Sequence, residues 1–146
     1  MVEINDACDS LSTIEKENIA SFAQKALDLL NRKNDSLTIV LSDDKNLHLL
    51  NNQFSGNNYP TDVLSFTANE VDPITGQNYL GDVIISMERA ASQAAHADIS
   101  PMKELATLII HGILHLCGYD HTDEKTLVEM FAMQGKIINN FEDFLP

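Results

Sequence analysis

Apolar residues recur at two different spacings along this chain, one typical of helices and one typical of strands. Residues 12–15 (Ser-Thr-Ile-Glu) form a capping box, and the apolar residues that follow as far as Leu30 lie on one side of a helix. Residues 37–41, 62–66 and 80–86 are short runs rich in apolar residues, which predicts three strands. The chain therefore contains both kinds of element.

Further helices are predicted from helical spacing and from the residues at their boundaries. Their expected ranges are 42–52, 87–97, 100–116, and from 122 through 137. Ser100 is the expected cap of the helix at 100–116, and Pro101 occupies its first position. Residues 53–60 are polar and are expected to form a loop.

The strands at 62–66 and 80–86 are expected to pair antiparallel. About a dozen residues separate them, and these include the turn sequence Asp-Pro-Ile-Thr-Gly at 72–76. No repeat or linker divides the chain, so residues 1–146 are predicted to form one domain. The predicted class is α+β, a small mixed β-sheet packed with helices, with a buried central helix that carries histidines.

Composition restricts the kinds of partner. The 146 residues include nine Lys and Arg against 22 Asp and Glu, a formal net charge of −13. Such a charge opposes binding to nucleic acid, because phosphate contacts supply most of the non-specific affinity. A function on RNA would therefore need a local basic patch, a phosphate bridged by a metal, or a protein partner that holds the RNA.

Targeting and redox features are few. No stretch reaches the ~18 apolar residues expected of a membrane span, and the N-terminus has neither the basic region nor the apolar core of a secretory signal. Cys8 and Cys117 form no metal-type pair. We therefore expect a cytoplasmic protein in a reducing compartment, with no membrane association. Cys117 is expected to be a buried apolar thiol that points away from the neighbouring histidines.

Three of the five histidines fall within eleven residues of the chain. His111 and His115 are four residues apart, which places them on one face of a helix, one turn above the other. Gly118 is suited to end that helix in a left-handed conformation, so that the chain turns back and delivers His121. Three neutral nitrogen ligands with an open fourth position form a catalytic zinc site. The alternative is a group of core histidines, each of which would need a buried hydrogen-bonding partner.

This spacing resembles the H-E-x-x-H-x-x-G-x-x-H motif of metzincin proteases, with both the glycine and the third histidine in register. Gly112 stands where those proteases carry the Glu that acts as general base on the metal-bound water. Glycine has no side chain to accept a proton. The metal ligands are therefore predicted without the chemistry of a protease.

Three blocks of sequence are more specific than the histidines alone. They are Leu-Asn at 50–51 followed by Pro-Thr-Asp-Val-Leu-Ser-Phe at 60–66, Leu-Gly-Asp-Val at 80–83, and His-Gly-x-Leu-His-Leu-x-Gly-Tyr-Asp-His at 111–121. Together they resemble the YbeY family of small bacterial metal-dependent endoribonucleases over most of the chain. The resemblance implies an α+β fold with one zinc ion on His111, His115 and His121.

The same resemblance implies a substrate and partners. It implies cleavage of single-stranded RNA, with roles in 16S ribosomal RNA 3′-end processing and in ribosome quality control. The implied partners are ribosomal RNA, a small-subunit ribosomal protein and a GTPase of ribosome assembly, and no DNA is expected.

One position departs from the family pattern. The family usually carries an Arg shortly after the Leu-Asn pair, where it is thought to serve catalysis or RNA contact, and here Ser55 occupies that place. A serine cannot make the bidentate phosphate contact of an arginine. Either another cation replaces it, or activity is weaker, or a partner holds the RNA. Arg89 and Lys103 are the nearest cations in sequence to the other blocks.

The proton-transfer group has several candidates. Asp120 is the carboxylate nearest to the predicted ligands and is the candidate catalytic residue, either orienting a ligand histidine or moving a proton; its structural alternative is a turn cap. Tyr119 is either a core aromatic or a hydroxyl that faces the site. Asp62 is interpreted as an anchor that shapes the cleft, and Asp82 as structural. Attack by metal-bound hydroxide and attack by the RNA 2′-OH both stay open.

Two other functions also stay open. A different zinc hydrolase with metzincin-like geometry would need a carboxylate from elsewhere in the chain near the metal. A non-catalytic, zinc-stabilised ribosome-assembly factor would bind proteins through its acidic surface, and Ser55 and the net charge favour it.

Overall fold

The computed structural model of the chain describes residues 1–55, 61–119 and 123–141. Within these ranges the structure contains four strands and five helices. In chain order they are β1 (Val2–Asp6), α1 (Thr13–Leu29), β2 (Ser36–Ser42), α2 (Asp44–Ser55), β3 (Val63–Val71), β4 (Asn78–Ser86), α3 (Met87–Ala97), α4 (Pro101–Leu116) and α5 (Glu124–Phe141).

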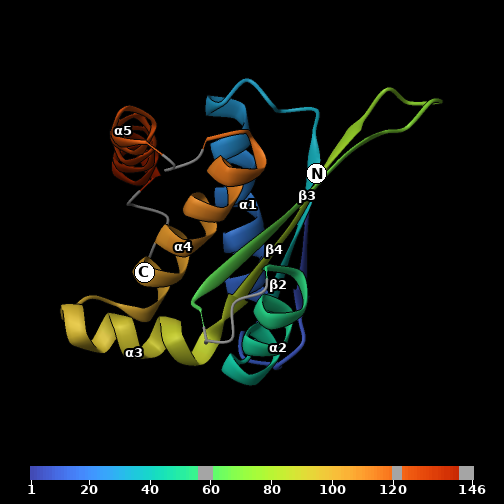
Figure 1. Ribbon diagram of the computed structural model, residues 1–146. Coiled ribbons are helices and arrows are strands. Elements are labelled where there is room, and N and C mark those ends of the chain that lie inside the picture. The colour runs from blue at the N-terminus through green and yellow to red at the C-terminus, as the bar shows by residue number, and fades with distance from the viewer. Residues whose placement is uncertain (56–60, 120–122, 142–146) are drawn as a thin grey trace.

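A mixed sheet with the strand order β1-β2-β4-β3 forms the centre of the fold. β1, β2 and β4 run parallel, and β3 pairs antiparallel with β4 at one edge of the sheet. Val63 lies opposite Ile85 and Thr67 lies opposite Gly81. Beyond a register shift that follows Thr67, the two strands continue as a hairpin that extends away from the body of the molecule (Figure 1).

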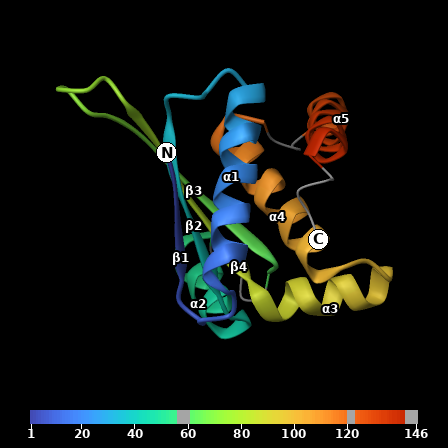
Figure 2. The ribbon, with the colours of Figure 1, turned by 180° about the vertical axis from the view of Figure 1, so that it is seen from behind.

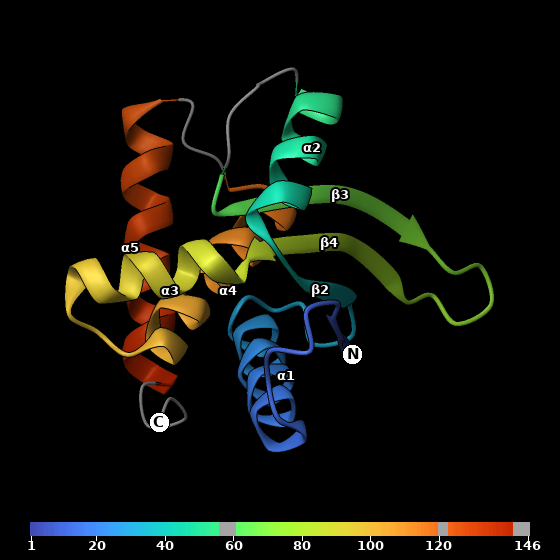
Figure 3. The same ribbon diagram turned by 90° about the horizontal axis from the view of Figure 1, so that it is seen from below.

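Helices cover both faces of this sheet. α1 and α4 pack on one face, and α2 lies on the other, against β3 and β4 (Figures 1 and 2). α5 packs against α4, and α3 leads from the end of β4 to the start of α4 (Figure 3). α4 therefore has neighbours on most of its sides, which agrees with the buried central helix predicted from the sequence.

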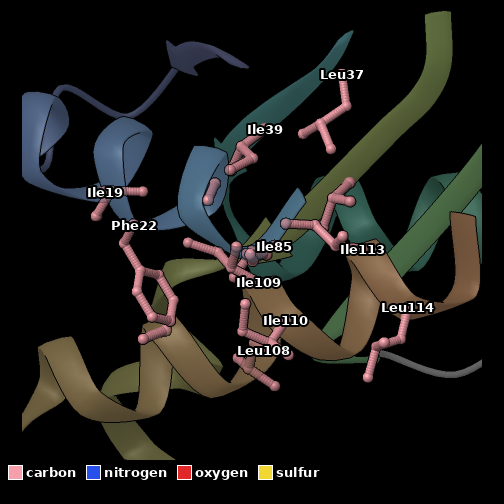
Figure 4. Packing of buried hydrophobic residues seen from close by; sticks show 14 of the residues in the cluster. Ile19, Phe22, Leu37, Ile39, Ile85, Leu108, Ile109, Ile110, Ile113 and Leu114 are labelled. Carbon is pink, nitrogen blue, oxygen red and sulfur yellow. The ribbon is translucent and has the colours of Figure 1, made fainter. Parts of the chain in front are cut away.

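One apolar core joins α1, α4 and the sheet (Figure 4). Phe22 of α1, Ile39 of β2, Ile85 of β4, and Ile109 and Ile113 of α4 are all almost completely buried. Burial of a side chain of this size contributes roughly 1.5–3 kcal/mol relative to leaving it exposed. This packing fixes α4 against the sheet, and α4 carries two of the predicted metal ligands.

The predicted α+β class and the antiparallel pairing of the strands around 62–66 and 80–86 are confirmed. The loop predicted at 53–60 is wrong at its start, because α2 continues to Ser55, and residues 56–60 lie outside the described ranges. The predicted first residue of the last helix, at 122, also lies outside them. In the part of the chain that the structure covers, no helix is both long and apolar enough to cross a membrane.

β1 was not predicted from the sequence. This edge strand is five residues long, and its only apolar residues, Val2 and Ile4, are partly buried while Glu3 and Asn5 are exposed. Two apolar positions are too few to distinguish a strand from a loop. The strand conformation of β1 is instead stabilised by parallel pairing with β2, in which Val2 lies opposite Leu37.

Candidate metal centre

Both ends of α4 are built as the sequence predicts. At its start, the Ser100 side chain accepts a hydrogen bond from the Lys103 amide at 3.1 Å, and Pro101 occupies the first turn. At its end, the Gly118 amide donates to the carbonyl of His115, and the Tyr119 amide donates to that of Leu114. These two bonds form a Schellman motif around Gly118, whose φ is +96°. The helix therefore stops immediately beyond His115.

His111 and His115 face each other on α4. The two Nε2 atoms are 3.2 Å apart, and the ring centroids are 4.8 Å apart with a T-shaped orientation. Both side chains are half-buried. The structure therefore brings together two of the three predicted ligands, and the Nε2 atom of each ring makes the contact.

This spacing fits a shared metal ion. Two nitrogens that each lie about 2.0–2.1 Å from a tetrahedral zinc ion are about 3.3 Å from one another. The 3.2 Å separation of the Nε2 atoms of His111 and His115 is thus close to the one that a shared zinc ion would require. The donor set, neutral imidazole nitrogen, is also one that zinc prefers.

His121, the predicted third ligand, and Asp120, the predicted catalytic residue, lie outside the residues that the structure describes. Their roles remain predictions. Within the described ranges, no group of three or more His, Cys, Asp or Glu side chains is placed to hold a metal ion.

A cleft of about 460 Å³ opens beside the histidines. Its lining residues are His111, His115, Thr61, Asp62, Val63, Leu64, Ser65 and Thr67. It therefore runs between α4 and the first half of the edge strand β3. The volume lies within the range of about 300–1,000 Å³ that is typical of ligand sites. Among these lining residues there is no Lys or Arg, and the one carboxylate is that of Asp62.

Asp62 is held in place from two sides. Its Oδ2 accepts a hydrogen bond from Gln93 Nε2 of α3 at 3.2 Å, and its backbone carbonyl accepts one from the Ser86 amide at 3.0 Å. This agrees with its interpretation as an anchor that shapes the cleft. Its charge also acts on α4, because burial and, to a lesser degree, the Asp62 carboxylate raise the pKa of Glu104. Asp62 is therefore both an anchor and a charged wall of the cleft.

Gly112, between the two histidines in sequence, faces the sheet. A Cβ at this position would lie 2.4 Å from Val83 Cγ1 and 3.3 Å from Ser65 Oγ. Ser65 Oγ also donates a hydrogen bond to the Gly112 carbonyl at 3.1 Å, which ties β3 to α4. The missing side chain thus allows α4 to approach β3 and β4 closely. A glutamate here would point into packed strands, so the fold has no room for the metzincin base at this position.

One contact of the histidine pair was not predicted from the sequence. Gln134 of α5 places its Oε1 3.3 Å from His111 Nδ1, the ring nitrogen that faces away from His115. The sequence carries an indication of it, because Gln134 is a polar residue on the same helical face as Met130 and Ile137, both of which are buried. A polar residue at an inward position needs a partner, and here the partner is a predicted ligand.

Three residues considered in the sequence lie away from the cleft. Tyr119 packs against the core as a partly buried aromatic, which agrees with its structural interpretation. Cys117 also packs against the core, and burial raises the pKa of its thiol. The Asp82 carboxylate accepts a hydrogen bond from the Tyr79 hydroxyl within β4. None of these three side chains lines the histidine cleft.

Neither cation considered as a substitute for the family arginine lines that cleft. Arg89 Nε donates to Asp44 Oδ1 at 2.8 Å in a neighbouring hollow, which Gln93 also lines. This ion pair lowers the pKa of Asp44. Lys103 lies in the first turn of α4, eight residues before His111. Arg89 therefore lines a different hollow from the one beside the histidines, and its guanidinium is already paired with the Asp44 carboxylate.

Comparison with known proteins gives consistent matches. The sequence model of a family described as Endoribonuclease YbeY matches residues 3–142. A Persephonella marina protein of that name is 39% identical over 133 residues, which are 90% of this chain and 87% of the relative. The Bacillus subtilis protein of that name is 35% identical over 151 residues, 97% and 95% of the two chains. A solution structure from Thermotoga maritima matches with a TM-score of 0.69 at 27% identity, covering 99% of this chain and 91% of the other.

Replacing Gly112 with glutamate, as in the metzincin motif, is expected to destabilise the protein and not to create a peptidase. The new side chain would overpack against Val83 and bury a carboxylate, which together cost roughly 3 kcal/mol or more. The free energy of unfolding from urea titration measures this. Gly135→Glu is the matched control, since a Cβ there meets no atom within 4 Å and the free energy should change by about 0.5 kcal/mol or less. A Gly112→Glu variant as stable as the control would contradict the close packing.

Proposed function

The chain belongs to the endoribonuclease YbeY family and is an endoribonuclease, and we propose that it uses one zinc ion, held by His111, His115 and His121, to cut single-stranded RNA. The cutting would serve 16S ribosomal RNA 3′-end processing and ribosome quality control in the cytoplasm. The observation that carries the zinc proposal is the 3.2 Å separation of the two Nε2 atoms on the wall of a cleft.

Charge supports a metal in this role. RNA is a polyanion, the protein carries a formal net charge of −13, and the described residues that line the cleft include a carboxylate but no Lys or Arg. Phosphate would therefore meet a neutral to negative surface unless a cation is bound there. A zinc ion would supply that positive charge and a Lewis acid that polarises a phosphoryl oxygen.

Asp62 is the group that we propose to take up a proton. Both routes left open by the sequence, attack by water and attack by the RNA 2′-OH, require the attacking hydroxyl to lose a proton. The Asp62 carboxylate lines the cleft beside the histidines, and Gln93 holds its Oδ2 from the α3 side. The anchoring amide fixes the orientation of the carboxylate toward the cleft. Asp120 keeps its predicted role as a group that orients a ligand or moves a proton.

Two protein partners are part of the proposal. A small-subunit ribosomal protein and a GTPase of ribosome assembly are the proposed partners, and they would place ribosomal RNA in the cleft. This suits a chain in which Ser55 replaces the family arginine and Arg89 is paired with Asp44. An additional role in ribosome assembly that needs no catalysis is the second candidate function, favoured by the same acidic surface and by the lack of cations among the described cleft residues.

Cleavage of an unstructured RNA by the purified protein tests this function. We expect cutting that is abolished by a chelator, restored by zinc, and reduced roughly 100-fold or more by His115→Ala, because loss of a ligand costs more than loss of a group that supports one. His96→Ala is the matched control, since His96 is an exposed histidine of α3 whose Nδ1 contacts the Ser92 carbonyl. Its rate should equal that of the unmodified protein.

The outcomes separate the candidate functions. Stoichiometric zinc binding without RNA cleavage, in the absence and presence of small ribosomal subunits, would contradict the proposal that a zinc ion at this site cuts RNA. Cleavage of a peptide instead of RNA would favour another zinc hydrolase. Equal activity of the His115→Ala and His96→Ala variants would contradict a role for the histidine pair.

Replacing the Asp62 carboxylate with an amide tests its role in proton transfer. Asp62→Asn keeps an oxygen for Gln93 but loses the base, so kcat should fall by about 10²- to 10⁴-fold while zinc affinity is retained. Asp28→Asn is the matched control, because Asp28 Oδ1 accepts from Gln24 Nε2 at 3.2 Å on the exposed side of α1. Single-turnover RNA cleavage measures both variants. An unchanged kcat in Asp62→Asn would show that Asp62 is an anchor alone.

A further inference from the structure

We propose that Gln134 is a positioning residue for the metal centre: its amide oxygen holds the Nδ1 proton of His111 and so leaves Nε2 as the nitrogen that binds zinc. This inference rests on the zinc site proposed above, and it concerns a residue on α5, an element outside the histidine helix. Its basis is a contact between side chains that are 23 residues apart in sequence.

The two ring nitrogens of His111 have different partners. Nδ1 lies 3.3 Å from Gln134 Oε1, and Nε2 lies 3.2 Å from His115 Nε2. An amide oxygen only accepts hydrogen bonds, so the nitrogen that faces it must carry the proton. A neutral imidazole has one N–H, which leaves Nε2 with its lone pair toward His115. The contact therefore selects the tautomer in which the nitrogen of the histidine pair is the free base.

That tautomer is the one that a shared metal ion requires. A metal ligand must present an unprotonated nitrogen, and the other ring nitrogen is normally held by a carbonyl, a carboxylate or water. With the opposite tautomer, the Nε2 atom of His111 would carry a proton directed toward His115, and this nitrogen could not bind the proposed metal ion. Gln134 therefore both orients the ring of His111 and directs its lone pair.

The packing of α5 explains why Gln134 is at this place. Met130 and Ile137 are completely buried, and Met133 and Ile138 pack partly buried against the core. These residues fix one face of α5 against α4, and Gln134 lies on that face, one turn beyond Met130. Apolar contacts before and after Gln134 in the sequence set the position of α5. The packing of the helix, and not the hydrogen bond to His111, therefore brings the Gln134 amide to the ring.

The zinc affinity of the purified protein tests the inference. It is measured after the metal has been removed, by titration with zinc in competition with a chromophoric chelator. Gln134→Leu removes the acceptor at similar size and should weaken zinc binding by about 10- to 100-fold. Gln134→Glu keeps an acceptor and makes the ring a stronger donor of electrons, so it should retain or tighten binding. Lys136→Leu, an exposed position on the same helix, is the matched control and should bind as the unmodified protein does.

A nitrogen-15 NMR spectrum of the histidine side chains supplies a second readout. In the zinc-loaded protein we expect His111 to carry its proton on Nδ1, and we expect Gln134→Glu to preserve this pattern. Equal zinc affinity of Gln134→Leu and Lys136→Leu, or a zinc-loaded His111 protonated on Nε2, would overturn the inference. If the unmodified protein and His115→Ala bind zinc equally poorly, it is the proposed zinc site that fails, and the role of Gln134 fails with it.

Discussion

The close approach of α4 to the sheet at Gly112 is the constraint on which the rest of the site depends. Because Gly112 has no side chain, the helix backbone packs against Val83 and accepts a hydrogen bond from Ser65. This contact fixes the rotation of α4 about its own axis. With Gly112 turned to the sheet, His111 and His115 face the cleft beside β3. The residue that removes the protease base is thus also the residue that places the ligands.

A second consequence concerns the surroundings of the histidines. Segments that are far apart in the sequence meet around them. Asp62, directly before β3, and Ser65 of β3 line the cleft, α3 holds Asp62 through Gln93, and α5 contributes Gln134. The ligands on α4 are supported by side chains that hold them or their neighbours in place. Such support is expected of a metal site, where the groups behind the ligands set their orientation and affinity.

Local patterns in the sequence predicted the parts that depend on local geometry. The four-residue spacing of His111 and His115 was enough to predict their meeting, and Gly118 was enough to predict the end of the helix. Contacts between distant segments were not predictable in this way. The Gln134 contact depends on how α5 docks, and β1 depends on its pairing with β2. Asp62 was interpreted as an anchor, and its partner Gln93 could be found only in three dimensions.

The central claim is that His111 and His115 share one zinc ion through their Nε2 atoms. X-ray absorption at the zinc edge of the zinc-loaded protein tests it most directly. We expect one zinc ion per chain, nitrogen or oxygen neighbours at about 2.0–2.1 Å, and the outer-shell scattering of three imidazole rings. A sulfur shell at about 2.3 Å, or a zinc environment without imidazole scattering, would contradict it.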